Sequence, residues 1–432
     1  MPTLEAPETK TRRLLAWLGA GLLAGGMPVH EVEEDVREVA ETLGHPRTQV
    51  ACSPNAISFS LASGEPATLE RVEGGLRLDQ LAEVSVLQAG LRTRSIGVDD
   101  ALARMATLRR QPHRYPKGGL LAGGVLSGAG IALVLAPSWP SVFFAAAIAP
   151  ATVALMLLSP RSSLVRTLTP FFAAFIASVI AFWAAGQGLV DSPLWTMIAP
   201  IAVLLPGALL VTGLTELAAG SMLAGTARLG YGTTQLLLFA LGLGAAVVLL
   251  RVPAERLDPA RPDELGWWAP LLGVFIVTIA ISLMESVSFS MVPWLLVTIL
   301  ATFLALRAGN LLSEAPWVGA FLGAAAASLV STVVEFLRPQ VPRVVAFLPS
   351  FWLLVPGSIG LVSVTRIEVA PDAAIGAVGG TTVIVAAIAL GIVVGASLAR
   401  PLRSVARRVG VLALLDRLPA RRQRPARAPR DQ

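Results

Sequence analysis

The residues that could carry chemistry in this chain are few, because charged side chains are nearly absent from most of it. Glu285 is the only ionisable residue between Trp267 and Leu306. Desolvation raises the pKa of a carboxyl group, so an acid among apolar segments is a candidate proton carrier. Glu285 also falls where two apolar segments must turn, and a solvated turn explains it equally well.

A second acid, Glu216, is followed by Arg228, with Gly220 and Gly225 between them. Glycine adopts turn conformations that other residues avoid. This stretch favours a re-entrant or interfacial element over a plain loop.

Two Pro-Gly pairs, Pro206-Gly207 and Pro356-Gly357, fall near the middle of two apolar segments. Proline removes a backbone donor and glycine loosens a helix, so carbonyl groups are left that a cavity or a neighbouring helix must satisfy. The functional interpretation is a pair of broken helices that line a substrate site. The alternative is a structural kink, which is common in membrane helices.

The elements that must position these residues are membrane helices. The chain has 432 residues, of which 54% are hydrophobic and 14% charged, whereas a soluble domain carries about 25% charged residues. A helix needs about 20 apolar residues to cross the hydrocarbon core. Ten predicted spans meet this need, at residues 119–136, 141–158, 168–186, 195–213, 230–250, 267–284, 287–306, 316–334, 344–364 and 376–399.

The first part of the chain has a different composition. Residues 1–118 hold 14 Lys and Arg and 15 Asp and Glu, a mixture typical of soluble proteins. Residues 1–117 are therefore predicted to form a small cytosolic α+β domain. Residues 14–29 are expected to pack within it as a helix, with a place on the membrane surface as the alternative. The apolar pattern predicts helices at 12–24, 28–44, 78–92 and 98–111, and strands within 48–61 and 67–73.

An internal repeat organises the predicted membrane part. Three short sequences recur in order at offsets of 148 to 150 residues: 204–207 as 354–357, 232–234 as 380–382, and 240–242 as 389–391. Five spans per half is an odd number, so the second half must cross the membrane in the opposite sense to the first. The predicted fold is all-α in the membrane, with ten transmembrane helices in two inverted five-helix repeats. The predicted boundaries are 118–250 for the first repeat, 251–266 for the loop between repeats, 267–399 for the second repeat and 400–432 for a basic cytosolic tail.

The distribution of Lys and Arg predicts the orientation. The loops at 137–140 and 187–194 contain neither residue, whereas the tail carries ten Arg against Asp416 and Asp431. Positive residues gather on the cytoplasmic side, so both termini are expected there, in a multi-pass protein of a bacterial inner membrane. The tail is expected to lie near anionic lipid rather than to bind nucleic acid.

Several function classes find no support in the sequence. Cys52 is the only cysteine, and His30, His45 and His113 are scattered without metal-binding spacing. No metal site, cofactor or intramolecular disulfide is expected. Ser53 lacks a GxSxG setting and a His–Asp partner pair, so no enzymatic activity is expected.

The chain resembles the threonine/serine exporter family. The resemblance rests on 26–44 leading into Ser53-Pro54-Asn55-Ala56-Ile57, on 205–229, and on Val355-Pro356-Gly357. It implies a cytosolic domain before ten spans, and export of L-threonine and L-serine driven by the proton motive force. The residues that match the family pattern in the first half are Pro206, Gly207, Glu216, Gly220 and Arg228. With Pro356 and Gly357, they are the expected substrate-binding set, and Glu216 and Glu285 are the expected proton-coupling candidates.

Other functions stay open at this stage. A channel, an exporter of another small metabolite, or a membrane-bound peptidase coupled to export would share much of this pattern. The expected partners are the amino-acid substrate, protons and membrane lipid, and the sequence is compatible with a homo-oligomer.

Overall fold

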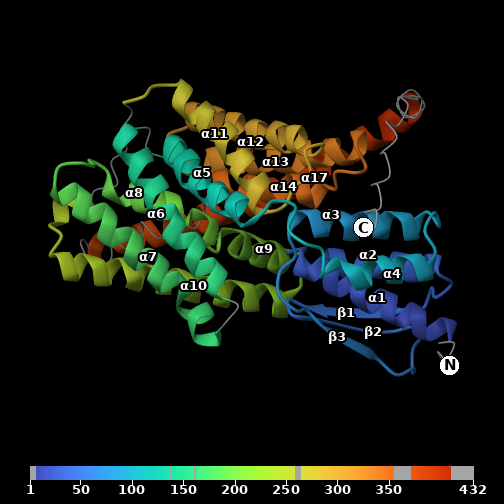
Figure 1. The fold of residues 1–432 in the computed structure, drawn as a ribbon. Coiled ribbons are helices and arrows are strands. Elements are labelled where there is room, and N and C mark those ends of the chain that lie inside the picture. Colours follow the sequence, from blue (N-terminus) through green and yellow to red (C-terminus); the bar gives the residue numbers. More distant parts are fainter. Residues whose placement is uncertain (1–5, 136–137, 160–161, 258–263, 355–370, 410–432) are drawn as a thin grey trace, which may run out of the picture.

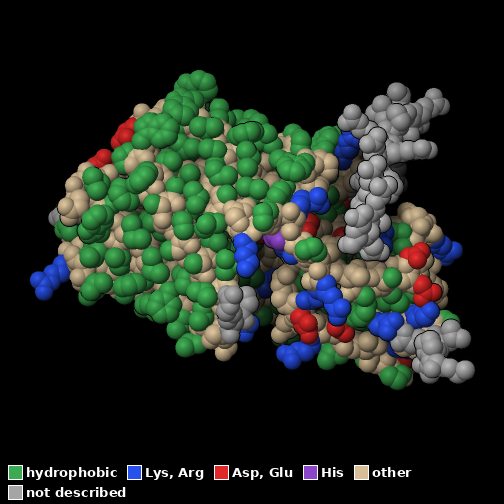
Figure 2. All heavy atoms as spheres, viewed as in Figure 1, with side chains coloured by type: hydrophobic (Ala, Val, Ile, Leu, Met, Phe, Trp, Pro, Cys, Tyr) green, Lys and Arg blue, Asp and Glu red, His purple; other side chains and the backbone are tan. Residues whose placement is uncertain are grey.

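This computed structural model describes residues 6–135, 138–159, 162–257, 264–354 and 371–409. An N-terminal α+β unit packs against one end of a bundle of apolar helices (Figure 1). On the face that Figure 2 shows, the bundle is largely hydrophobic, whereas charged side chains gather on the N-terminal unit and along its boundary with the bundle.

The N-terminal unit contains four helices and a three-stranded antiparallel sheet of order β1-β2-β3. The hairpin between β1 and β2 pairs Val50 with Phe59. These elements lie where the apolar pattern predicts them. They are α1 (Pro7–Ala24), α2 (Val29–Thr42), β1 (Gln49–Ser53), β2 (Ala56–Ser60), β3 (Thr68–Arg71), α3 (Leu78–Arg92) and α4 (Val98–Leu108).

The core of this unit is built around α1. Leu14, Leu18 and Leu22 are fully buried, together with Val36 of α2 and Ile57 of β2. Burial of one such side chain is worth about 1.5–3 kcal/mol. The first apolar stretch is therefore a packed helix of the unit, as the sequence predicts.

Among the described residues, seven helices of the bundle are long and apolar enough to cross a membrane. They are α5 (Lys117–Leu135), α6 (Trp139–Leu158), α7 (Ser163–Gly186), α10 (Met222–Leu250), α12 (Val292–Leu312), α13 (Pro316–Leu337) and the stretch Gly379–Ala399 of α17 (Pro371–Val409). An eighth candidate is the bent pair of α8 (Pro193–Ile201), extended by the 3-10 turn η2 (Ala202–Leu204), and α9 (Gly207–Ala218).

The remaining two predicted spans correspond to shorter apolar helices. One is α11 (Trp268–Met284), and the other is the segment Arg343–Leu354, made of α14 (Arg343–Phe347), η4 (Leu348–Ser350) and α15 (Phe351–Leu354). The ninth predicted span runs on into residues 355–364, which lie outside the described part. The described helices thus give seven or eight candidate spans, fewer than the ten that the sequence predicts. The turn η3 (Ala254–Leu257) lies between α10 and α11.

Two helix pairs in the bundle share the same close contact. Gly242 of α10 meets the backbone of Phe171 in α7, and Gly391 of α17 meets the backbone of Phe321 in α13. A Cβ on either glycine would clash with that carbonyl oxygen. The two contacts are related by offsets of 149 and 150 residues, the same offsets that the sequence repeat has.

The first helices of the two predicted halves, α5 and α11, also pack against each other. Gly123 of α5 lies beside Met284, whereas Gly130 lies beside Val277 and touches Gly273. Residue numbers rise along α5 as they fall along α11, so the two helices run antiparallel.

Candidate functional site

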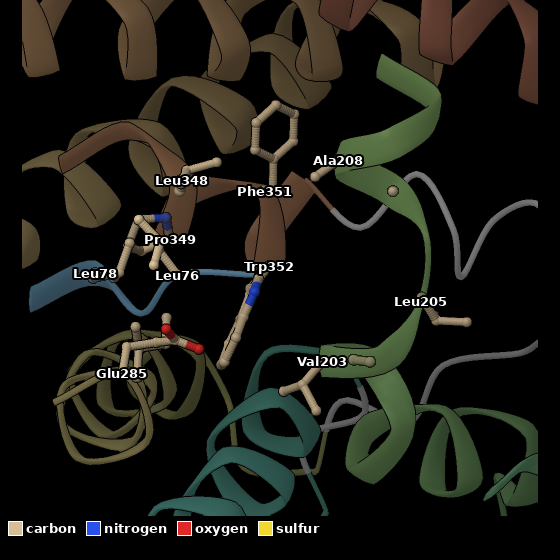
Figure 3. A pocket seen from close by; sticks show the side chains of 13 residues that line it. Leu76, Leu78, Val203, Leu205, Ala208, Glu285, Leu348, Pro349, Phe351 and Trp352 are labelled. Carbon is tan, nitrogen blue, oxygen red and sulfur yellow. The ribbon is translucent and has the colours of Figure 1, made fainter. Parts of the chain in front are cut away.

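A cavity of about 250 Å³ lies between the bent pair α8–α9 and the short helical segment Arg343–Leu354 (Figure 3). One wall is the break between α8 and α9, and the opposite wall is η4 with α15. The end of α11 and the chain just before α3 complete it. Its lining residues include Val203, Leu205, Gly207, Ala208, Glu285, Leu348, Pro349, Phe351, Trp352, Leu76 and Leu78. The volume suits a small molecule, since pockets for drug-sized ligands hold roughly 300–1,000 Å³.

The first wall results from proline chemistry. Pro206 cannot donate a hydrogen bond, and the chain bends by 61° between the two helices on either side of it. Helix α9 then begins at Gly207 without a side-chain cap. The first amides of a helix lack intrahelical acceptors, and the helix dipole adds partial positive charge there. Because Gly207 and Ala208 line the cavity, this end of α9 can face an anionic group.

The second wall is the segment Arg343–Leu354, in which a 3-10 turn that sequence patterns did not predict separates α14 from α15. Pro349 lies in the short 3-10 turn between α14 and α15. Both Pro349 and the nearby Trp352 line the cavity. The expected pair Pro356-Gly357 lies outside the described residues. A signal for Pro349 was present in the sequence, because it follows Pro200 of α8 by 149 residues.

Glu285 brings a carboxylate into this cavity. It follows the last residue of α11, and its side chain and the Trp352 ring point toward one another (Figure 3). Burial raises the pKa of Glu285, while the backbone amide of Leu78 bonds the carboxylate and opposes the rise. Among nearby charges, Asp79 raises the pKa further, and Arg77 and His113 lower it. The site thus contains one acid with a raised pKa beside an aromatic ring.

The turn that carries Glu285 is held by the linker before α5. His113 binds the Met284 carbonyl at 2.9 Å, the Arg114 amide donates to Ser286 Oγ at 2.7 Å, and the Tyr115 hydroxyl donates to the Val287 carbonyl at 2.9 Å. Ser286 is buried and has a φ of 60°. Such a conformation is uncommon for serine, and these contacts hold it.

Glu216 and Arg228 form a buried ion pair outside this cavity. Arg228 Nε lies 3.1 Å from each Glu216 carboxylate oxygen. The side chain of Glu216 is fully buried and that of Arg228 is 7% exposed. Both also bind the N-terminal unit, because the Val29 amide donates to Glu216 Oε1 at 3.0 Å and Arg228 Nη2 donates to the Met27 carbonyl at 3.3 Å. Glu216 therefore caps α2, whose own N-cap, Pro28, has no side-chain hydrogen bond.

Glycines let this pair form. Gly220 has a φ of 87°, and the Ser221 amide bonds the Glu216 carbonyl at 2.8 Å, the pattern of a Schellman helix end. Gly213 and Gly225 face each other across α9 and α10, and a Cβ on Gly225 would lie 2.6 Å from the Gly213 carbonyl oxygen. The segment between Glu216 and Arg228 is thus a tight helix-to-helix turn.

The structure therefore divides the expected site residues into two groups. Gly207 and Glu285 lie at the cavity, with Pro206 at its edge as the residue that breaks the helix. Glu216, Gly220 and Arg228 lie at the boundary with the N-terminal unit. Their predicted contact with substrate stays a prediction. Among the described residues, no group of three or more His, Cys, Asp or Glu side chains could hold a metal ion.

The apolar helices, one pair of them bent at Pro206, are those of a multi-pass membrane protein. The model of the ThrE family, described as "Putative threonine/serine exporter", matches residues 13–250, more than half of the chain. The chain belongs to this family, which confirms the resemblance seen in the sequence.

One curated relative is named "Probable threonine/serine exporter" and comes from Mycobacterium tuberculosis (strain ATCC 25618 / H37Rv). It is 31% identical over 154 residues, which are 35% of this chain. The aligned part spans only 28% of that relative's length. No solved structure matches the chain.

Proposed function

We propose that this protein exports small neutral amino acids, L-threonine and L-serine, from the cytosol and that the proton motive force drives the export. The observation that carries the proposal is the cavity between the bent pair α8–α9 and the segment Arg343–Leu354, in a chain of this exporter family. Its volume of about 250 Å³ suits a molecule of a few heavy atoms.

The cavity offers partners for both charges of an amino acid. Half-helix N-termini in transporters point at anionic substrate groups, and the α9 terminus at Gly207 is available for an α-carboxylate. The Glu285 carboxylate and the Trp352 ring suit an α-ammonium group, since aromatic faces attract cations. Glu285 can also exchange a proton for the substrate, which would couple export to the proton gradient.

We further propose that the membrane part has ten spans in two inverted repeats. The equivalent glycine contacts of α10 with α7 and of α17 with α13 support a duplication, and the antiparallel packing of α5 against α11 supports opposite orientations. We propose that the N-terminal unit and both termini lie on the cytoplasmic side of a bacterial inner membrane, because Lys and Arg gather on that side. In this orientation, Glu216, Glu285 and Arg343 lie at the cytoplasmic ends of their helices.

The test is transport by the full chain in proteoliposomes. Vesicles receive radiolabelled threonine or serine, with and without an imposed pH gradient, and leucine and aspartate serve as controls for specificity. We expect saturable, gradient-dependent flux that a protonophore abolishes. If neither threonine nor serine flux responds to the gradient, the proposal is wrong. Saturable flux that ignores the gradient favours a channel or a uniporter.

A further inference from the structure

A short segment of the N-terminal unit, residues 27–31, connects α9 and α10 with α14. We call it the clasp. On one side, the Met27 carbonyl accepts from Arg228 of α10 and the Val29 amide donates to Glu216 near the end of α9. On the other side, Glu31 Oε2 lies 2.6 Å from Nη2 of Arg343, the first residue of α14.

The second attachment is anchored in the bundle through Arg343. The Arg343 amide donates to Glu335 Oε1 of α13 at 3.0 Å. The side chains of Glu31 and Arg343 are each about one-third exposed, at 32% and 33%. This ion pair is therefore weaker than the buried pair of Glu216 and Arg228, because solvent screens the attraction between partly exposed charges. The clasp thus has one strong attachment and one weak one.

The clasp also forms one wall of a second, larger cavity. This cavity has a volume of about 660 Å³ and lies between α9, α13, α14 and α17. Met27, Pro28, His30 and Glu31 close it toward the N-terminal unit, while its other walls are mostly apolar side chains of the bundle. Removal of the clasp would open this cavity on the side of the N-terminal unit.

We propose that the clasp is the cytosolic gate of the transporter and must release α9 or α14 before substrate enters. This inference rests on the proposed function. Inverted-repeat transporters work by movement of one bundle against another. The clasp joins α9 of the first half to α14 of the second, so that movement must strain or break one attachment. Release at Arg343 is the easier route, because that pair is the more exposed.

The first experiment needs no substrate. A Cys52→Ser chain with Ser331→Cys, a buried residue that lines the larger cavity, is labelled in inside-out vesicles with a membrane-impermeant maleimide. Ala389→Cys on α17 serves as a second reporter in case the first disturbs folding. We expect Arg343→Met to raise the labelling rate about two- to fivefold and Glu216→Gln to raise it at least about tenfold. Glu83→Gln, which removes an exposed ion pair with Arg104 within the N-terminal unit, should leave it unchanged.

The second experiment locks the clasp. In the Cys52→Ser background, Glu31→Cys and Arg343→Cys are joined by a reducible bis-thiosulfonate cross-linker. Threonine flux should stop on cross-linking and return on reduction, and single-cysteine variants treated in the same way give the reference rate. If the uncross-linked protein carries no threonine or serine, the proposed function fails, while the labelling rates still decide on the gate. Equal labelling in all variants, or full flux through the cross-linked protein, would overturn the gate.

Discussion

The replacement Glu216→Gln should detach the N-terminal unit from the bundle. The substitution keeps a side-chain oxygen for the Val29 amide but leaves the Arg228 guanidinium buried without a counter-charge. Breaking one partner of a buried ion pair costs about 3–5 kcal/mol. The lower figure applies here, because Arg228 keeps the Met27 carbonyl as an acceptor. Since about 1.4 kcal/mol is a factor of ten, the population of the detached form should rise about a hundredfold.

The assay is limited trypsin cleavage of the full chain in lipid nanodiscs. Cleavage after Arg114 reports detachment, because the Arg114 amide is bonded to Ser286 in the attached form. When detachment and reattachment are fast, the cleavage rate follows the detached population. Glu83→Gln is the control, since its pair with Arg104 is exposed and lies within one unit.

A second variant separates charge from packing. Glu216→Gln combined with Arg228→Met leaves no lone charge, and isosteric apolar replacement of a buried pair is often nearly neutral. We expect this double variant to recover most of the protection from trypsin. Wild-type cleavage in Glu216→Gln would refute the reasoning, and a double variant as sensitive as the single one would show that packing, not charge, holds the unit.

The other predictions concern the cavity and the boundary. Glu285→Gln should abolish gradient-driven accumulation of threonine, while exchange of internal for external threonine continues. The control Glu314→Gln, at an exposed position, should change neither rate. Accumulation by Glu285→Gln at the wild-type level would exclude Glu285 as the proton carrier. Trp352→Ala should raise the KM for threonine about 2- to 30-fold, as expected for loss of a cation–π contact of about 0.5–2 kcal/mol. Trp352→Phe keeps an aromatic ring and should keep most of the affinity. Equal KM values for Trp352→Ala and the wild type in flux assays would contradict this prediction. Burial raises the pKa of Asp35 to about 6, so the folded N-terminal unit binds more protons than the unfolded chain between pH 4 and 6, and its stability should fall as the pH rises through that window. Thermal unfolding of Asp35→Asn, followed by fluorescence, should lack this pH dependence.

The spacing of apolar residues predicted the helices and strands whose formation depends on neighbouring residues in the sequence. The spacing of Val32, Val36 and Val39 predicted α2, and these residues are buried. The alternation around Ile57 and Phe59 predicted the hairpin in the same way. Charge depletion predicted apolar helices, because a helix in lipid needs no polar side chains.

Long-range contacts were beyond such patterns. Nothing near Glu285 in the sequence indicates that it shares a cavity with Gly207 and Trp352, which approach it only through folding. Glu216 and Arg228 were found as an acid and a base on either side of a glycine-rich stretch. Their contacts with the N-terminal unit are made to backbone groups of Met27 and Val29, so no particular residue type in the sequence marks these contacts. Pro349 was detectable through its offset from Pro200, but a single proline match in an apolar chain has little weight.

The contacts of the clasp also set the order in which the protein can be assembled. Arg343 lies 312 residues after its partner Glu31 in the sequence, and Glu216 lies 187 residues after its partner Val29. Domains generally fold as units during synthesis, the N-terminal ones first. The N-terminal unit can therefore fold on the ribosome long before its binding partners emerge. Its attachment to α9 precedes its attachment to α14, so a nascent chain stopped between these two helices should carry the buried pair but lack the weaker one. The ion pair of Glu31 with Arg343 can therefore form only after the second half of the chain has been synthesised.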